Sequence, residues 1–416
     1  MRVLIVNDYG FRNGGAESAI LNLRQGLESR GDEVRIFSSS AGLDDRGRTG
    51  FADELARGTT SSLRTLLQTA NPWAPLALKK ELDRFAPEVV HIHLFLTQLS
   101  PLILPVLRDV PCVYTAHWQR AICPTGTRFL PSGEACRQPS GVACYTSGCL
   151  PFRDWVPLMA QMSLLRRWRN SIDRVVACSE ALRNRLVEGG FPDVEVIPDG
   201  VPAQRARPSL ADPPSVLFAG RLVREKGVLI LLQAFRQVLD RVPSARLDIA
   251  GSGPEADLAR SMAAEKGLSD RVVFHGWLSH NDLEHLYSRA WVQAAPSVWD
   301  EPFGMVAIEA AARGVPAVVS DVGGLAEIVI EEETGFKVPP GEPDALARAL
   351  LRFVGDKALA ETMGARARLR AAGHFSIERH VDRIRDLYQR VSTNARLGRI
   401  AHKGRSGTAS HNGDRY

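Results

Sequence analysis

Two glutamates flank an apolar stretch in the segment EPFGMVAIE, which runs from Glu301 to Glu309. Gly304 and Gly314 predict the start and end of a helix, so Glu301 precedes the helix and Glu309 lies about one and a half turns inside it. A buried carboxylate is costly unless it is paired or hydrogen-bonded. A surface-facing Glu309 is the alternative, but its Ile and Ala neighbours leave no evident polar face. We therefore expect both carboxylates to reach one ligand site.

A second segment, GRLVREKG at residues 220–227, carries two cations five residues apart, Arg221 and Lys226. It follows a predicted strand, SVLF. A guanidinium is a planar fork and an ammonium is a point charge, so the pair suits a diphosphate. The alternative is a solvated charged loop, the usual form of a run of charges.

Three glycine-rich loops also follow predicted strands: GGAE at 14–17, GSGP at 251–254 and VGG at 322–324. Gly14 and Gly15 open the first predicted helix, where backbone amides bind phosphate and glycines permit close approach. Each loop alone also fits a tight structural turn. GGAE is not a full G-x-G-x-x-G, and we find no nicotinamide fingerprint. With GRLVREKG they make four loops that follow strands at one predicted sheet edge. Four such loops are harder to explain as structural turns than any one alone.

Three histidines lie in or at the ends of predicted strands. His117 ends the strand CVYTA, a place where a structural role is more common than a catalytic one. His91 and His93 alternate in EVVHIH and so face one side of their strand. With no carboxylate at useful spacing, we expect this pair to form a polar lining and not a metal site.

The composition describes an ordinary globular protein. The chain has 416 residues, of which 44% are hydrophobic and 24% charged, with a net charge of +5 and a pI near 9.0. Its length predicts two domains. No apolar run approaches the length of a membrane span, and the apolar run at the N-terminus is too short for the core of a signal peptide. We therefore expect a cytoplasmic protein. We see no nucleic-acid-binding module and expect no nucleic-acid partner.

Short apolar strands alternate with helices in both halves of the chain, which predicts an α/β fold with two parallel sheets. We expect two Rossmann-like domains facing each other across a cleft, at residues 1–200 and 213–375. An irregular cysteine-rich insert, 118–152, interrupts the first. A helix at 376–394 and a disordered basic tail at 395–416 follow the second.

Taken in order, these motifs resemble a retaining glycosyltransferase of family 4 with the GT-B fold, of the bacterial surface-polysaccharide type. The resemblance covers the chain to about residue 390. It rests on GGAE, His117, GRLVREKG, GSGP, EPFGMVAIEA and VGGLAEIV. It implies a nucleoside-diphosphate sugar in the C-terminal domain and a glycan or lipid-linked acceptor in the N-terminal domain. The last helix resembles the element that crosses back to the N-terminal domain.

The resemblance also implies roles for single residues. Arg221 and Lys226 match the diphosphate clamp, Glu309 the carboxylate that takes the ribose hydroxyls, and Glu301 the one beside the donor sugar. His117 matches a histidine that meets the donor sugar. Further donor-binding positions are Gly14, Gly15, Phe303, Gly304 and Met305. No metal is needed for catalysis if protein cations and amides stabilise the charge on the leaving diphosphate.

Two features depart from the common family pattern. Trp118 follows His117 where many members have aspartate, which puts one acceptor contact in doubt. The insert carries four cysteines, which resemble those of a subset of surface-polysaccharide transferases: Cys123, Cys136, Cys144 and Cys149. Four thiolates could hold a structural zinc that orders the segment. Disulfides and unlinked thiols are the alternatives.

The segment LLRRWRN, residues 164–170, places three arginines beside Trp168. It fits either a solvated helix face or peripheral contact with an anionic membrane, as a lipid-linked acceptor would require. Two other functions also remain. A sugar-nucleotide epimerase of the same architecture does not explain both GRLVREKG and EPFGMVAIE. A non-catalytic nucleotide-sugar-binding protein is disfavoured by the intact Glu301, Arg221, Lys226 and His117.

Overall fold

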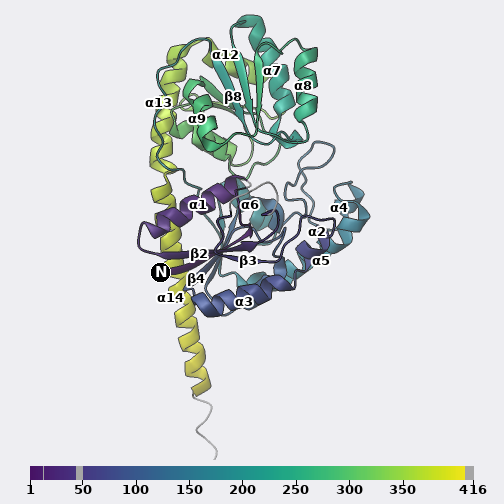
Figure 1. Ribbon diagram of the computed structural model, residues 1–416, viewed down its shortest axis with the longest axis vertical. Helices are drawn as coiled ribbons and strands as arrows, with labels where there is room; N and C mark the ends of the chain where they lie inside the picture. Colours follow the sequence, from purple (N-terminus) through teal and green to yellow (C-terminus); the bar gives the residue numbers. More distant parts are fainter. Residues whose placement is uncertain (13, 44–49, 408–416) are drawn as a thin grey trace, which may run out of the picture.

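The computed structural model describes residues 1–12, 14–43 and 50–407, and it shows two α/β domains, one above the other in Figure 1. The N-terminal domain is built on a seven-stranded parallel sheet in the order β3-β2-β1-β4-β5-β6-β7. Its strands are β1 (Arg2–Tyr9), β2 (Glu33–Ser39), β3 (Glu54–Ala56), β4 (Val89–Ile92), β5 (Cys112–Ala116), β6 (Arg174–Ala177) and β7 (Val194–Val196).

The C-terminal domain is built on a six-stranded parallel sheet in the order β10-β9-β8-β11-β12-β13. Its strands are β8 (Ser215–Ala219), β9 (Arg246–Ala250), β10 (Val272–Gly276), β11 (Val292–Ala295), β12 (Ala317–Ser320) and β13 (Gly335–Val338). Two open parallel sheets, each with helices on both faces, confirm the predicted pair of Rossmann-like domains.

Helices cover both sheets. The N-terminal domain has α1 (Gly15–Glu28), α2 (Arg64–Thr69), α3 (Trp73–Phe85), α4 (Ala143–Thr146), α5 (Phe152–Trp168), α6 (Glu180–Glu188) and the 3-10 turns η1 (Pro101–Leu107), η2 (Gln119–Ala121) and η3 (Arg169–Ser171). The C-terminal domain has η4 (Arg224–Lys226), α7 (Val228–Arg241), α8 (Ala256–Glu265), α9 (His280–Arg289), α10 (Met305–Ala312), α11 (Leu325–Ile328), α12 (Pro343–Val354) and α13 (Lys357–His374). The last helix is α14 (Ile377–Gly407).

The central strand β1 shows why the chain needs both layers. Val3 and Ile5 pack with α1 and α14 on one face, whereas Leu4 and Val6 pack with α3, η1 and α5 on the other. Alternate residues of a strand point to opposite faces, so a strand covered on both sides must be apolar throughout. The loops at the carboxyl ends of such strands are left to carry the polar chemistry.

The N-terminal domain also contains short elements that no simple apolar pattern marks. The apolar segment before β5 forms the 3-10 turn η1 and not an α-helix, because Pro105 within it lacks an amide hydrogen and clashes with the preceding turn. β3 and α2 lie in the largely polar residues 50–72. Helix α14 continues to Gly407, past its expected end at 394. The prediction of a disordered tail is therefore wrong for 395–407, and 408–416 lie outside the described residues.

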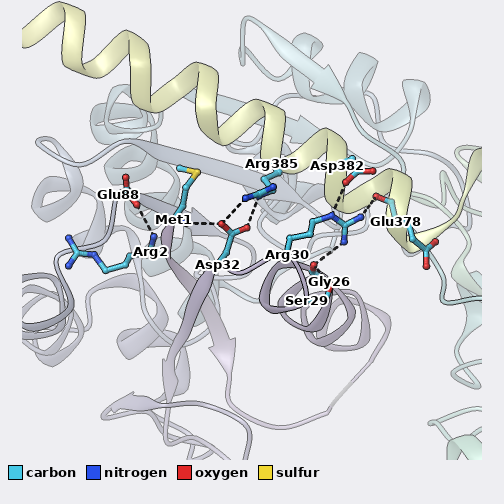
Figure 2. Close-up of polar contacts among 10 residues, drawn as sticks. All are labelled: Met1, Arg2, Gly26, Ser29, Arg30, Asp32, Glu88, Glu378, Asp382 and Arg385. Carbon is cyan, nitrogen blue, oxygen red and sulfur yellow. Dashed lines mark hydrogen bonds and ion pairs between the residues drawn. The ribbon is translucent and has the colours of Figure 1, made fainter.

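Helix α14 returns from the C-terminal domain to pack on α1 and the N-terminal sheet (Figure 1). Figure 2 shows its polar anchors. The Asp32 carboxylate accepts hydrogen bonds from the N-terminal ammonium at 2.7 Å and from Arg385 Nε at 2.8 Å. Arg30, in the turn between α1 and β2, pairs through Nε with Asp382 Oδ1 of α14 at 2.8 Å. The first and last parts of the chain thus hold each other in place.

The two domains also touch beside the strand ends. Gln119 Nε2 donates to the carbonyl of Asp300 at 3.0 Å, and the Arg185 guanidinium pairs with the Asp300 carboxylate. The Glu327 carboxylate accepts the Ala181 amide at 2.8 Å at the start of α6, where the helix dipole favours an anion. These contacts fix the segment around Asp300 against the N-terminal domain. No helix among the described residues is long and apolar enough to cross a membrane.

Candidate functional site

Two helix starts, one from each domain, meet at the candidate site. Gly14 caps α1 and Gly304 caps α10. A Cβ atom placed on Gly15 would lie 3.5 Å from Met305 Cγ, so the two starts face each other closely. The first amides of a helix have no intrahelical acceptor and carry the positive end of its dipole. Glycine-rich loops from both domains therefore frame a place suited to an anion.

Glu301 precedes the α10 cap in the chain and is buried, where Lys226 and Ser297 hold it. Lys226 Nζ pairs with Glu301 Oε1, and Ser297 Oγ donates to Oε2 at 2.5 Å. The ammonium also lies 5.8 Å from the centroid of the Trp299 ring. The structure thus brings together the ends of two segments, GRLVREKG and EPFGMVAIE, that the sequence singled out separately. The Glu301 charge is compensated and fixed before any ligand arrives.

Arg221, the second predicted clamp residue, is far more exposed than Lys226. Its side chain is 65% exposed, and within the described residues it pairs only with Glu225, at 3.6 Å. An exposed guanidinium with one weak partner can turn toward a bound anion at little cost. Lys226 is preorganised in this structure, and Arg221 is not.

The loops that carry these side chains pack too closely for any residue but glycine. Gly227 has φ +71° and lies directly against the carbonyl of Pro296. A Cβ on Gly304, at φ +111°, would come within 2.5 Å of Leu325 Cδ2. Gly324 donates its amide to the carbonyl of Glu301 at 2.7 Å. The glycines of VGG therefore serve to hold the Glu301 segment.

Glu309 lies on α10 beside Tyr287 of α9. Burial raises the pKa of Glu309 to about 7; Arg313 and Tyr287 oppose the rise, and Glu284 adds to it. Arg313 is engaged elsewhere, because its Nε lies 2.7 Å from Glu284 Oε1 and its Nη1 donates to the carbonyl of Glu309 at 2.8 Å. The Glu309 side chain is half-buried, and its carboxyl is partly desolvated and only partly compensated by charge.

His117 belongs to a buried chain of polar groups. Its Nε2 lies 2.7 Å from His93 Nδ1, and its Nδ1 lies 3.6 Å from Asp199 Oδ2. Burial raises the pKa of Asp199, but the adjacent His117 together with His380 outweighs it and leaves that pKa below its ordinary value. The carboxylate that orients His117 follows β7 and gave no signal in the sequence. Glu17 was also missed; it lies buried in α1, close enough to His117 for the imidazole to lower the pKa of its carboxyl against the rise caused by burial.

His91 and His93 face the same side of β4, as predicted, with ring centroids 4.1 Å apart. The expected polar lining is wrong for His91, which is buried under α14, whereas the buried His93 contacts His117. His91 Nδ1 lies 2.6 Å from the Tyr388 hydroxyl and Nε2 lies 2.7 Å from Thr115 Oγ1. Burial lowers the pKa of both histidines well below its ordinary value, so both remain neutral.

The four cysteines of the insert are free thiols of intermediate exposure. Burial is the main cause of a raised pKa at Cys144 and Cys149, and neighbouring thiols of Cys123 and Cys136 raise it further. The thiols therefore gather in one region. Among residues 1–12, 14–43 and 50–407, however, no three histidine, cysteine or acidic side chains already stand in a metal-binding arrangement.

Two known protein families match most of this chain. The family described as Glycosyltransferase Family 4 matches residues 13–205, and Glycosyl transferases group 1 matches residues 202–370. The chain is 30% identical over 394 residues to glycogen synthase of Mycobacterium tuberculosis (strain H37Rv), which covers 87% of each protein. It is 32% identical over 234 residues to a GDP-mannose-dependent alpha-(1-6)-phosphatidylinositol monomannoside mannosyltransferase of the same strain, covering 51% of this chain and 61% of that protein.

A solved structure has a similar fold over most of this chain. Sucrose-phosphate synthase from Thermosynechococcus elongatus superposes with a TM-score of 0.72 at 26% identity, covering 94% of this chain and 99% of that one. The chain therefore belongs to the group 1, family 4 glycosyltransferases and has the GT-B fold, which confirms the family that the motifs predicted.

Proposed function

We propose that the protein transfers a sugar from a nucleoside-diphosphate sugar to a glycan, glycolipid or small-molecule acceptor, with retention at the anomeric carbon. The observation that carries the proposal is the ion pair of Lys226 with Glu301, in the segment that leads into α10, whose start in turn faces the start of α1. A donor with its diphosphate there would extend its ribose toward Glu309 and its sugar toward Glu301 and His117. The mannosyltransferase relative is named for GDP-mannose, which supports a nucleotide-sugar donor.

The protein's own cations and amides would drive the reaction. Cleavage of the anomeric bond leaves negative charge on the diphosphate. Lys226, Arg221 and the amides of Phe303, Gly304 and Met305 would stabilise that charge more in the transition state than in the ground state. We therefore propose catalysis without a metal. A transferase whose activity disappears in EDTA and returns with Mg²⁺ or Mn²⁺ would contradict this part.

The experiment that tests the donor is a thermal-shift screen of UDP-, GDP- and ADP-sugars. A ligand that binds only the folded state adds about 2.7 kcal/mol to the free energy of unfolding at a hundred times its Kd. The unfolding temperature rises as a result. One nucleotide should stand out. Product analysis then separates a transferase from an epimerase, since a transferase releases the nucleoside diphosphate and an epimerase keeps it attached. If no nucleotide sugar shifts the transition, the proposal fails.

We also propose that the four cysteines take up one structural zinc. No residue from 129 to 157 is buried, so this segment has no hydrophobic core to order it. A tetrahedral thiolate site would supply the missing constraint, and the gathered thiols need to move only within their own segment. Metal analysis of protein purified under reducing conditions should give one zinc per chain. Absence of zinc together with four titratable thiols would exclude the site.

A further inference from the structure

Exposed apolar side chains are concentrated in one quarter of the chain. Among the described residues, fourteen large hydrophobic side chains are exposed, and nine of them fall between residues 55 and 156: Leu55, Leu63, Leu66, Trp73, Leu76, Val142, Tyr145, Phe152 and Val156. Scattered single hydrophobics are normal on a protein surface, but a concentration of this kind marks an interaction site.

Most of these side chains lie on helices of a single layer. Leu66, Leu76 and Phe152 are 61%, 70% and 60% exposed and lie on α2, α3 and α5. Helices α3 and α5 cover the same face of the N-terminal sheet, and Figure 1 shows α2 and α4 beside α5. Thr65 Oγ1 donates to Asp154 Oδ1 at 2.9 Å, which ties α2 to the start of α5.

An aromatic cluster extends this layer toward the insert. The rings of Tyr145 and Phe152 have centroids 5.8 Å apart, and Trp155 lies 5.8 Å from Tyr145 and 5.9 Å from Phe152. Tyr145 belongs to α4, whose residues are not buried. Helices α2 and α4 contact α5, and α3 covers the same face of the sheet as α5. The exposed leucine and aromatic side chains of these four helices are here called the apolar face.

The charges on these helices are mainly positive. The exposed cations of the apolar face and its edges are Arg57, Arg64, Lys79, Lys80, Arg153, Arg166 and Arg167. The acids beside them are largely engaged: Asp154 accepts from Thr65, and buried Glu81 pairs with Arg35 and Arg84. Asp83 is an exposed exception. Exposed leucine and aromatic side chains edged by cations match the chemistry of an anionic bilayer surface.

We infer that the apolar face binds an anionic lipid surface peripherally, with Leu66, Leu76 and Phe152 among the side chains that enter the headgroup region. This surface is not the one that the sequence indicated. Trp168 packs against the hydrophobic core of the N-terminal domain, and Arg169 stacks over Phe191 at 5.5 Å, so LLRRWRN offers arginines but no apolar anchor. The cations attract the headgroups, and the apolar rows on the other helices supply the insertion.

Vesicle flotation tests the inference. We expect the full chain to float with vesicles of phosphatidylcholine and phosphatidylglycerol in equal parts, and to remain in the dense fraction with phosphatidylcholine alone. The triple variant Leu66→Glu, Leu76→Glu, Phe152→Glu should lower the partition coefficient about a hundredfold or more, because it removes three insertion sites and adds three repulsive charges. Raising the salt to 0.5 M should weaken wild-type binding, since the Debye length falls below about 5 Å.

A matched control lies in the other domain. Leu258 and Leu369 are 53% and 75% exposed, so the double variant Leu258→Glu, Leu369→Glu adds acidic charge without touching the apolar face and should float as the wild type does. Equal loss in both variants, wild-type flotation of the triple variant, or no flotation of the wild type would overturn the inference. So would sedimentation showing a dimer that only the triple variant dissociates. The donor thermal shift should be unchanged in every variant, which separates this test from that of the proposed function.

Discussion

At the scale of single residues, Glu309 has a carboxyl whose surroundings disfavour its charged form. Its carboxyl is desolvated against Tyr287, and the nearest cation, Arg313, is shared with Glu284. A carboxylate accepts hydrogen bonds more strongly than the neutral acid, so ribose hydroxyls would favour the ionised form. With a pKa raised to about 7, Glu309 is half ionised near neutral pH, and donor binding must include its deprotonation below that pH.

This predicts that donor affinity depends on pH in one direction. The raised pKa means that the acid form predominates below pH 7 and the carboxylate above it. Affinity should be constant above about pH 8 and fall up to tenfold for each unit below about pH 6. Calorimetric titration of the nucleoside diphosphate between pH 5.5 and 8.5 measures this. Diphosphate titration in the same range contributes its own slope, so the comparison must be with a variant.

Glu309→Gln supplies that comparison. Its amide cannot titrate, so the variant should bind more weakly at pH 8 and lose the part of the pH dependence that belongs to Glu309. Glu284→Gln is the matched control, because it removes a nearby acid that does not contact the proposed ribose position and, with less repulsion, should move the onset to lower pH. Identical pH profiles in the wild type and Glu309→Gln would refute the assignment.

Lys226 and Glu301 allow stability to be separated from catalysis. Lys226→Met leaves a buried carboxylate with only Ser297 as partner, which should lower the free energy of unfolding by about 3 kcal/mol. Adding Glu301→Gln removes that uncompensated charge and should restore most of the loss. Turnover should stay at least about a hundredfold below wild type in both variants, because the diphosphate lacks its ammonium. Denaturant unfolding and donor turnover are the two measurements.

A different outcome would be equally informative. If the double variant recovered turnover along with stability, Lys226 would serve only to neutralise Glu301 and would not act on the diphosphate. Arg221→Met is the control without the stability effect, since its side chain is 65% exposed and has only a weak ion pair.

At the scale of elements, the sequence predicted strand ends better than it predicted what packs on them. Short apolar runs predicted strands that alternate with helices, because a strand covered on both faces leaves a simple pattern, as β2 does. The contact between Lys226 and Glu301 joins residues 75 positions apart and follows only from the packing of loops. Asp199 and Tyr388 were missed for the same reason. Their partners lie on other elements, and nothing local marks them.

The insert contacts GRLVREKG, the loop proposed to bind the donor diphosphate. Arg224 of η4 crosses to its tip, where Nη1 donates to the carbonyl of Pro131 at 2.6 Å and Nη2 to that of Ser132 at 3.2 Å. Its guanidinium also lies 6.0 Å from the centroid of the Phe129 ring. One cation of GRLVREKG thus binds the other domain. The backbone of GRLVREKG and the insert are joined at the edge of the site.

Arg224→Ala should release the tip of the insert. Exposed hydrogen bonds of this kind contribute about 1 kcal/mol or less, so the free energy of unfolding should hardly change. Limited proteolysis at 129–149 should be at least severalfold faster, because the segment has no buried residue to hold it. Gly133→Ala should act alike, since its φ is +98° and a Cβ there would lie 2.5 Å from Arg224 Nη2.

The control for Arg224 is Arg236→Ala. Arg236 pairs with Asp240 within α7 and contacts no other element through that pair, so its loss should leave the cleavage rate of the insert unchanged. Equal protection of the insert in Arg224→Ala and the wild type would show that other contacts hold the tip.

At the scale of the whole molecule, α14 closes the chain upon itself. It leaves the C-terminal domain and packs Val381, Ile384 and Leu387 against the N-terminal sheet and α1. Beside the ion pairs of Figure 2, the closest part of this contact is between Gly26 of α1 and Val381, where a Cβ on Gly26 would overlap Val381 Cγ2. A mid-helix glycine costs roughly 0.5–1 kcal/mol relative to alanine, so its presence here indicates that close approach is worth more.

Gly26→Ala therefore tests how the last helix docks. Overpacking typically costs about 1–3 kcal/mol, which should outweigh the gain in helix propensity and lower the free energy of unfolding. Adding Val381→Ala makes room for the new methyl group, so the double variant should be more stable than Val381→Ala alone. Gly373→Ala in α13 is the control, because no heavy atom lies within 4 Å of its added Cβ, and it should be neutral or stabilising. Hydrogen exchange should show faster opening of α14 in Gly26→Ala only; unchanged protection of α14 there would mean that its ion pairs, and not this contact, hold the two ends of the chain together.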